Sequence, residues 1–300
     1  MPEKEALNAL LKSLRQSRFS DNFCVGGSFP IDMSSVAVEG VGTLQFPLYP
    51  RDCRPLLDIA AQAPYGRGTE TIVDTSVRNT LEIPAEQVHL ADHFEMRLNE
   101  ALSHIAEKLH LDRNRLDCQL YKLLIYSRGG FFLPHRDSEK VPGMIATLVV
   151  VLPNPFDGGN LVVRHDQKTR YFPFDMARRK SRSRTAADIK TAEFVAFFSD
   201  CEHEVSRITS GVRLCLAFNL IIQPRPRLDR SYTDSTSDVD LRQAIEEWNE
   251  IWPDQPIVFA LEHLYTNAGL APGLLKGADA TLLEQLEKVA VDLDLSLHFG

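Results

Sequence analysis

The sequence predicts an α+β fold, in which a double-stranded β-helix (a jelly roll) is supported by N-terminal helices and followed by a small C-terminal α/β appendage. Three observations predict it. Short strand-like segments dominate from Leu116 onward, an amphipathic helix precedes them, and a polar stretch from Asp229 to Asp240 separates them from a C-terminal segment with mixed helix and strand patterns. Antiparallel strands around a small pocket are typical of a double-sheet jelly roll.

These boundaries divide the chain. We expect residues 1–228 to form one domain, with helical support over residues 1–115 and the jelly-roll core over residues 116–223. Residues 229–300 are expected to form a linker and the small α/β segment.

The N-terminal support is predicted to contain three helices, over Glu3 to Arg18, Pro50 to Ala63 and Asp92 to Leu109. Pro64 ends the second, because proline cannot continue a helix. Between the first two, Gly26 to Pro47 is expected to be irregular and extended. The third helix carries apolar residues at helical spacing, which form a stripe able to lie on a sheet. The stripe consists of Phe94, Leu98, Leu102, Ile105 and Leu109.

The core is predicted to be made of short strands. Ile145 to Leu152 is continuously apolar, as expected for a strand that is covered on both faces. The predicted strands are Leu116 to Tyr126, Ile145 to Leu152, Asn160 to Arg164, Arg170 to Phe174, Glu193 to Phe198, His203 to Ile208 and Val212 to Gln223.

The C-terminal segment has a different pattern. Leu241 to Trp248 and Ala280 to Leu293 predict helices, while Pro256 to Glu262 and Leu295 to Phe299 predict strands. The last predicted strand reaches the end of the sequence without a polar tail, so we expect the chain to be part of a longer protein.

Composition indicates a globular protein of intracellular type. The 300 residues are 44% hydrophobic, which is enough to bury a full core. The five cysteines show no close pairing, and their odd number predicts reduced thiols. No apolar run is long enough for secretion or for membrane spanning. We expect a cytoplasmic protein that does not contact membranes, with the nucleus as the alternative.

Charge limits the partners. A net charge of −8 disfavours nonspecific binding to nucleic acid. One basic segment, Arg178 to Arg184, lies where a loop between strands is expected. It is interpreted either as a solvated loop or as an electropositive lid that recruits an acidic partner.

Four residues carry the predicted chemistry. His135 and Asp137 lie two apart, and because side chains alternate along a strand, both can reach one ion while the residue between them points away. With His203 they would form a site of two imidazoles and one carboxylate, which leaves metal positions open as in non-haem Fe(II) oxygenases. Zinc is chemically compatible with the same ligands.

Arg213 favours iron chemistry with an anionic cosubstrate over a zinc hydrolase. Glu204 to Leu220 is interpreted as a hairpin with a turn at Thr209 to Gly211. Arg213 is therefore expected inside the pocket, on a strand beside the strand of His203. A buried guanidinium needs an anionic partner, and its planar fork suits a carboxylate. The residues expected to share its face are Cys215, Ala217 and Asn219.

The ordered motifs from Leu116 to Ile222 resemble the Fe(II) and 2-oxoglutarate dependent oxygenases, and within them the prolyl 4-hydroxylase type. The motifs are Tyr126-Ser-Arg-Gly-Gly130, His135-Arg-Asp137, Ile145-Ala-Thr-Leu148, Gly158-Gly-Asn-Leu-Val162, Glu193 to Phe198, His203 and Gly211-Val-Arg213.

The resemblance implies a role for each matching residue. His135, Asp137 and His203 would bind Fe(II), Arg213 would pair with the distal carboxylate of 2-oxoglutarate, and Tyr126 would hydrogen-bond the same cosubstrate. With O2 as the third reactant, the implied products are succinate, CO2 and a hydroxylated substrate, and the resemblance leaves room for ascorbate. It also implies that residues 66–89 border the pocket and select substrate. The alternative is that this segment is an ordinary connecting loop.

Asp137 and Asn219 also bear on the reaction and the substrate. The presence of Asp137 disfavours halogenation, because the halogenating relatives lack the carboxylate ligand. The nucleic acid demethylase branch typically carries a second arginine at the position of Asn219. A protein side chain, such as prolyl, is therefore slightly preferred over a small metabolite, and nucleic acid is disfavoured. The alternatives from other classes are a noncatalytic jelly-roll interaction module and a cupin-like metal enzyme that uses no 2-oxoglutarate.

Other polar residues are interpreted as structural. His89 and His93 have a helical metal spacing, but Asp92 between them is expected to start a helix. His165 is expected at the surface. Lys122 is expected to extend into water, with a position at the pocket mouth as the alternative. Small buried cysteines are common packing residues, although their spacing could turn two of them into the pocket. These two are Cys201 and Cys215.

Overall fold

The computed structural model describes residues 22–67, 70–174, 191–223, 239–253, 255–271 and 273–298. Three sequence predictions lie outside the described residues. These are the helix over Glu3 to Arg18, the basic segment Arg178 to Arg184, and most of the linker from Asp229 to Asp240.

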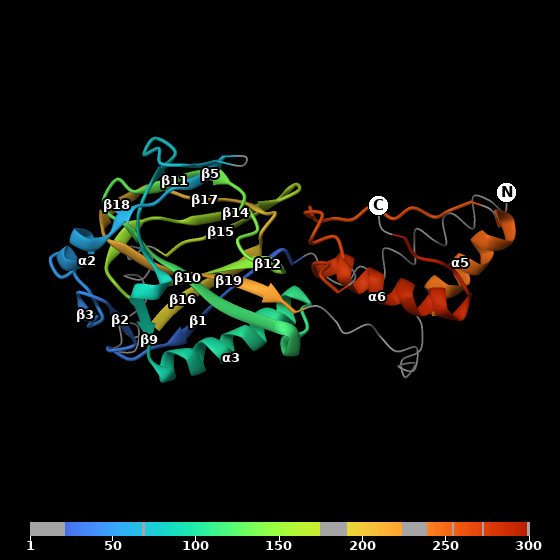
Figure 1. Ribbon diagram of the computed structural model, residues 1–300, viewed down its shortest axis with the longest axis horizontal. Helices are drawn as coiled ribbons and strands as arrows, with labels where there is room; N and C mark the ends of the chain where they lie inside the picture. Colours follow the sequence, from blue (N-terminus) through green and yellow to red (C-terminus); the bar gives the residue numbers. More distant parts are fainter. Residues whose placement is uncertain are drawn as a thin grey trace.

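Two facing antiparallel sheets form the body of the molecule (Figure 1). The larger sheet has the order β1-β16-β12-β19-β10-β8-β4, and the smaller sheet has the order β15-β14-β17-β11-β7. Buried side chains from both sheets belong to one hydrophobic core. The predicted α+β fold with a jelly-roll core is therefore confirmed.

The larger sheet consists of β1 (Cys24–Pro30), β4 (Ala61–Gln62), β8 (Leu81–Pro84), β10 (Leu116–Tyr126), β12 (Met144–Val151), β16 (Thr191–Phe198) and β19 (Arg213–Ile222). The smaller sheet consists of β7 (Arg78–Asn79), β11 (Phe131–His135), β14 (Leu161–His165), β15 (Lys168–Phe172) and β17 (Glu202–Val205). Three minor pairings join β13 (Phe156–Gly158) to β18 (Ile208–Gly211), β2 (Val36–Val38) to β3 (Gly42–Thr43) and β9 (Val88–Leu90), and β5 (Tyr65–Arg67) to β6 (Glu70–Ile72). Two short 3-10 turns, η1 (Ala85–Gln87) and η2 (Arg113–Arg115), precede β9 and β10.

Helix α3 (Asp92–Leu109) has the predicted bounds and lies on the outer face of the larger sheet (Figure 1). All five residues of the predicted apolar stripe are buried in the common core. His110 ends the helix in the left-handed conformation, with φ of 53°, and its N–H caps the last turn. The apolar stripe therefore covers the outer face of the sheet that carries Arg213.

The earlier N-terminal elements differ from the prediction. The helix expected over Pro50 to Ala63 is only α2 (Arg54–Ile59), because the chain turns extended at Ala60 and joins the larger sheet as β4. The segment from Gly26 to Pro47, expected to be irregular, supplies most of β1 and all of β2 and β3.

The predicted hairpin between the strands of His203 and Arg213 is wrong. Strand β18 intervenes and pairs with β13, so the chain crosses from the smaller sheet to the larger one. Gly211 makes this crossing with φ of 75°, and a Cβ there would lie 2.2 Å from the Pro155 carbonyl oxygen. Arg213 therefore lies in the sheet opposite His203 rather than on a neighbouring strand.

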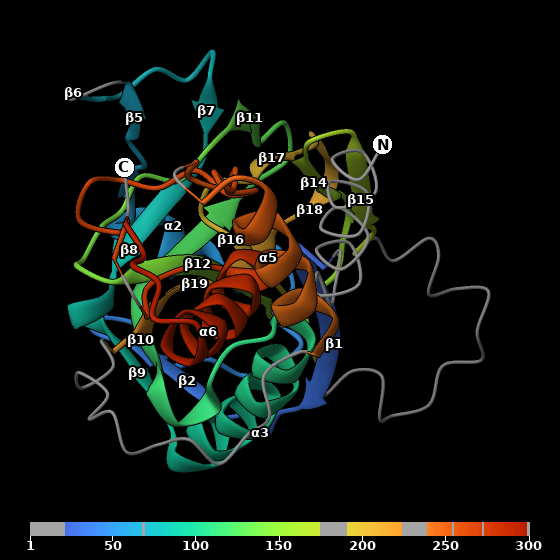
Figure 2. The same ribbon diagram turned by 90° about the vertical axis from the view of Figure 1, so that its right-hand side faces the viewer.

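The C-terminal segment packs two helices, α5 (Val239–Ile251) and α6 (Gly277–Asp292), around a small core of their own. Figure 2 looks along the molecule with these helices in front of the sheets. Residues 256–262 and 295–298 are irregular, so the two strands predicted there are wrong for the part of the chain that is described. The observed appendage is helical. None of the described helices is both long and apolar enough to cross a membrane.

Candidate active site

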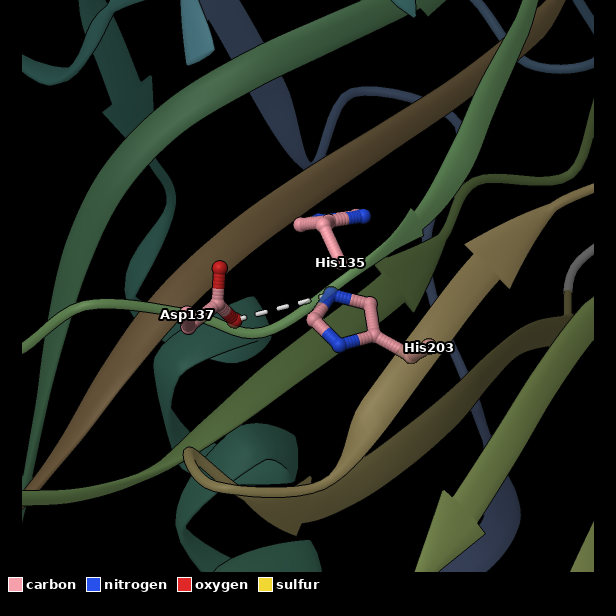
Figure 3. A group of neighbouring side chains, drawn as sticks. All are labelled: His135, Asp137 and His203. Atoms are coloured by element: carbon pink, nitrogen blue, oxygen red, sulfur yellow. Dashed lines mark ion pairs between the residues drawn. The ribbon is translucent and has the colours of Figure 1, made fainter. Parts of the chain in front are cut away.

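Three side chains with metal-ligand chemistry converge beside strands β11 and β17 of the smaller sheet (Figure 3). His135 ends β11 and is paired in register with His203 on β17, while Asp137 follows two residues after His135. One ligand atom from each lies within 4.8 Å of the others. Asp137 Oδ2 is 3.6 Å from His203 Nε2, and the two imidazole centroids are 4.1 Å apart.

Backbone contacts orient both imidazoles. His135 Nδ1 lies 2.8 Å from the Leu133 carbonyl oxygen, and His203 Nδ1 lies 3.2 Å from the Cys201 carbonyl oxygen. A carbonyl oxygen only accepts, so each Nδ1 carries the proton and donates it. In the neutral ring each Nε2 then keeps a free lone pair, which is the arrangement that metal-binding histidines commonly use.

The protonation states also suit a cation. Burial and the neighbouring His203 lower the pKa of His135 from 6.5 to about 3, so this ring is neutral near pH 7. Burial alone would raise the pKa of Asp137, but the two imidazoles and the hydroxyl of Thr147 outweigh it and lower the pKa. Thr147 Oγ1 donates to Asp137 Oδ2 at 2.6 Å. A neutral imidazole and an ionised carboxylate are the forms that bind metal.

Arg213 is buried with incomplete hydrogen bonding. The residue is only 1% exposed, and its Nη1 donates to Cys215 Sγ at 3.2 Å. Nε and Nη2 find no partner among the described residues. The guanidinium carbon lies 5.2 Å from the ring centre of Tyr126, its cross-strand neighbour, and 5.4 Å from that of Phe174. Because an unpaired buried cation costs several kcal/mol, this group fits a bound carboxylate.

One cavity of about 360 Å³ connects these groups. Its wall includes His135, Asp137, His203, Arg213 and Tyr126. Burial raises the pKa of the Tyr126 phenol, so the hydroxyl stays protonated and can donate a hydrogen bond. The alternate residues of β19 also line the cavity, as their spacing predicts. They are Cys215, Ala217 and Asn219.

Two further cationic residues line the cavity, and for each the sequence had offered this position only as one of two alternatives. Lys122 is 7% exposed and its Nζ lies 2.6 Å from Glu82 Oε2, so the prediction that it extends into water is wrong. The cause is β8, which brings Glu82 beside β10. Arg78, in the expected substrate-selecting segment, lies on β7 beside β11 and lines the same cavity.

A second group of two histidines and an aspartate was also missed. His165, expected at the surface, lies 3.4 Å from Asp200 through Nε2, and His263 Nδ1 lies 3.1 Å from the same Oδ2. Lys276 Nζ donates to Asp200 Oδ1 at 3.0 Å. Ion pairing and hydrogen bonds thus satisfy Asp200 without a metal. This group could not be predicted from the sequence, because His263 belongs to the C-terminal segment and no sequence pattern predicts a contact between that segment and β14.

The remaining candidates lie apart from the cavity. His89 contacts Glu39 on the surface and His93 contacts Ser35, so the interpretation of both as structural agrees with their positions. Cys201 does not line the cavity, and its Sγ lies 3.8 Å from the Phe23 carbonyl oxygen.

Comparison with known families places residues 121–221 in a match to the family model described as the 2OG-Fe(II) oxygenase superfamily. The match contains His135, Asp137, His203 and Arg213 and covers about a third of the chain. It confirms the predicted resemblance to this superfamily and, for the matched region, the prediction of a 2-oxoglutarate-dependent Fe(II) dioxygenase. Among curated proteins, no sequence matches the chain significantly.

Several solved structures are similar to the chain at low identity. A prolyl-4-hydroxylase from Pseudomonas putida is 16% identical with a TM-score of 0.39, and the alignment covers 72% of this chain and 99% of that one. A Trichoplax adhaerens prolyl hydroxylase in complex with a hypoxia inducible factor peptide is 14% identical with a TM-score of 0.40, covering 71% and 92%. An oxidoreductase of the 2OG-Fe(II) oxygenase family from Burkholderia pseudomallei is 14% identical with a TM-score of 0.36, covering 71% and 90%. These similarities assign no substrate.

Proposed function

We propose that the chain hydroxylates a protein side chain, with prolyl preferred, in a reaction that consumes 2-oxoglutarate and O2 and releases succinate and CO2. One observation carries this proposal. The buried guanidinium of Arg213, with Nε and Nη2 unpaired among the described residues, faces the same cavity as the His135, Asp137 and His203 group. A cation that needs a carboxylate, beside ligands that suit Fe(II), matches an oxygenase that takes up a keto diacid.

Each residue has a role in this proposal. His135, Asp137 and His203 would hold Fe(II), Arg213 would hold the distal carboxylate of 2-oxoglutarate, and Tyr126 would donate its phenol proton to the same molecule. When bound, Fe(II) with 2-oxoglutarate and O2 supplies the oxidising power for hydroxylation. The protein orients the ligands through the Leu133 and Cys201 carbonyl groups and Thr147, and the cavity keeps the reacting atoms away from bulk water.

The wider setting belongs to the same proposal. Residues 1–228 act as the oxygenase domain and residues 229–300 as a linker and an accessory segment. Ascorbate serves as an auxiliary reductant, the protein works in the cytoplasm, and neither nucleic acid nor membrane is a partner. The basic segment Arg178 to Arg184 would recruit an acidic partner.

Anaerobic titration with Fe(II) and 2-oxoglutarate tests the proposed chemistry. We expect a weak visible charge-transfer band that appears only when both are present. Arg213→Ala should weaken 2-oxoglutarate binding by tenfold or more, because it removes a charge-assisted hydrogen-bonding group. Arg51→Ala, at a surface position, is the matched control.

Two alternative functions give different results in that titration. A noncatalytic jelly-roll module gives no band, and a cupin-like metal enzyme binds metal without responding to 2-oxoglutarate. A His203→Ala variant that kept full Fe(II) affinity would contradict the ligand assignment.

A further inference from the structure

The cavity wall is strongly basic in a protein that is acidic as a whole. Of the described residues, five with cationic side chains line it and one with a carboxylate, Asp137, although the net charge of the chain is −8. A concentration of one sign of charge in a cleft raises the local concentration of oppositely charged ligands. The five cations are Arg78, Lys122, Arg136, Lys140 and Arg213.

The proposed function accounts for only part of this charge. A ferrous ion and Arg213 together carry three positive charges, and Asp137 and 2-oxoglutarate together carry three negative ones, so a loaded centre is neutral. Lys122 is neutralised by Glu82 at 2.6 Å. Among the described residues, Arg78, Arg136 and Lys140 form no close ion pair with a carboxylate. Arg136 also borders a second cavity lined by Asp166, Asp200, Glu202 and Glu262, and the charge of Lys140 acts on Asp137.

Arg78 is the buried member of this set. It is 8% exposed, Nη1 donates to the Pro64 carbonyl oxygen at 2.6 Å, and Nε finds no partner within the described part of the chain. Its guanidinium carbon lies 4.5 Å from the ring centre of Phe132, which stacks on His135 at 3.4 Å between ring centres. Arg78 is thus held one ring away from the metal-ligand group and retains an unused donor.

Arg136 and Lys140 lie at the mouth of the same cavity. Both residues are exposed, and both flank Asp137 in the segment that follows β11. In the described part of the chain, Lys140 Nζ makes one hydrogen bond, to the neutral hydroxyl of Ser138 at 2.7 Å. The positive charge therefore runs from the cavity mouth down to Arg78.

We propose that Arg78, Arg136 and Lys140 form a carboxylate-binding subsite that selects an acidic peptide, in which glutamate or aspartate flanks the hydroxylated residue. This inference rests on the proposed function and names its substrate class. A planar guanidinium with a free N–H suits a carboxylate, and the two exposed cations at the mouth suit further acidic residues along an extended peptide. A free small acid offers the same carboxylate chemistry, and the experiment separates the two sources.

Fluorescence anisotropy on the full chain, loaded anaerobically with Fe(II) and 2-oxoglutarate, measures this selectivity. The probes are fluorescein-labelled nonapeptides with a central proline and glutamates at each flanking position in turn, compared with the same peptides carrying glutamine. We expect the best glutamate peptide to bind at least tenfold more tightly than its glutamine counterpart, and added salt to reduce the difference.

Variants assign the preference to the three cations. Arg78→Gln should reduce the preference about tenfold, and the double variant R136Q/K140Q, which changes only exposed residues, should reduce it without affecting folding. Arg51→Gln, at an exposed arginine that does not line the cavity, should leave it unchanged. Arg78→Lys, which keeps charge but loses the planar fork, should retain part of the preference.

Each outcome is decisive. Displacement of the peptide by glutarate, with bound 2-oxoglutarate in place, supports the carboxylate subsite but indicates that a free small acid, rather than a peptide, supplies the bound carboxylate. Equal binding of glutamate and glutamine peptides overturns the inference, as does an Arg78→Gln variant that loses 2-oxoglutarate affinity as severely as Arg213→Ala. Because the charge-transfer band reports the cosubstrate and anisotropy reports the peptide, failure of this inference is distinguishable from failure of the proposed function.

Discussion

Thr147 shows how a neutral side chain can support the candidate metal group. It lies on β12 in the larger sheet, yet its hydroxyl reaches Asp137 Oδ2 at 2.6 Å across the cavity. This hydrogen bond stabilises the ionised carboxylate and fixes its orientation. The resemblance named the motif that contains Thr147, but the contact depends on how the two sheets face each other, which local spacing does not encode.

Replacing Thr147 with valine tests this support. The change keeps the shape of the side chain and removes the donor, so we expect Fe(II) affinity to fall about tenfold or more, in the range typical of outer hydrogen-bonding partners. A fluorescent divalent-metal competition assay measures the affinity. Thr43→Val, on an exposed strand, is the control. Unchanged affinity in Thr147→Val would show that Asp137 does not need this hydrogen bond.

At the level of elements, the sequence predicted what local patterns determine. Helix α3 and strand β10 have the predicted bounds, because a continuous apolar stripe and an alternating strand are properties of neighbouring residues. The hairpin predicted between the strands of His203 and Arg213 was wrong, since a turn at Gly211 suits either a hairpin or a change of sheet. Only the pairing of β18 with β13 distinguishes the two.

The two glycines Gly211 and Gly40 give a direct test of that crossing. Both have φ near 75°, but a Cβ at Gly40 meets no atom within 4 Å, whereas one at Gly211 lies 2.2 Å from Pro155 O. We expect Gly40→Ala to lower the free energy of unfolding by about 1 kcal/mol, from the left-handed backbone alone. Gly211→Ala should cost several times more and should weaken 2-oxoglutarate binding through Arg213. Urea titration measures the first effect; equal losses for the two variants would show that the close approach is unimportant.

For the whole molecule, Asp200 is one of several groups that attach the C-terminal helices to the jelly roll, together with the hydrogen bonds from Arg115 to Gly273 and from Thr266 to Glu139. Asp200, in the turn between β16 and β17, accepts from the Leu264 N–H, His263 and Lys276 of the C-terminal segment and lies beside His165 of β14. Sequence patterns predicted the two helices but not this attachment, because partners at long sequence separation leave no periodic signal. The turn also leads into β17 and His203, so the attachment borders the candidate site.

This attachment should depend on pH in a defined direction. The hydrogen bond with Asp200 is the main cause that raises the pKa of His165 above 6.5, so the contribution of His165 to stability is complete below pH 6.5 and is lost as pH rises through the raised value. Burial opposes ionisation of Asp200, but His165, His263 and Lys276 hold its pKa well below 3.8, so its contribution is present above pH 3.8 and is lost in stronger acid. Asp166 and Glu262 also act on His165 in the raising direction.

The C-terminal helices should therefore be held most firmly between about pH 4 and 6.5. Both tryptophans of the sequence, Trp248 and Trp252, lie in this segment with ring centres 4.4 Å apart, so tryptophan fluorescence reports its unfolding specifically. We expect the fluorescence-detected urea midpoint to fall as pH rises from 6 to 8. Asp200→Asn should lower the free energy of unfolding by on the order of 3 kcal/mol, and with it the midpoint, and should flatten the pH dependence of the midpoint, because it leaves Lys276 and the histidines without their carboxylate. Asp58→Asn, which removes an exposed ion pair with Arg54, should change neither the midpoint nor its pH dependence. If the pH dependence persisted in Asp200→Asn, a group other than the Asp200 cluster would cause it.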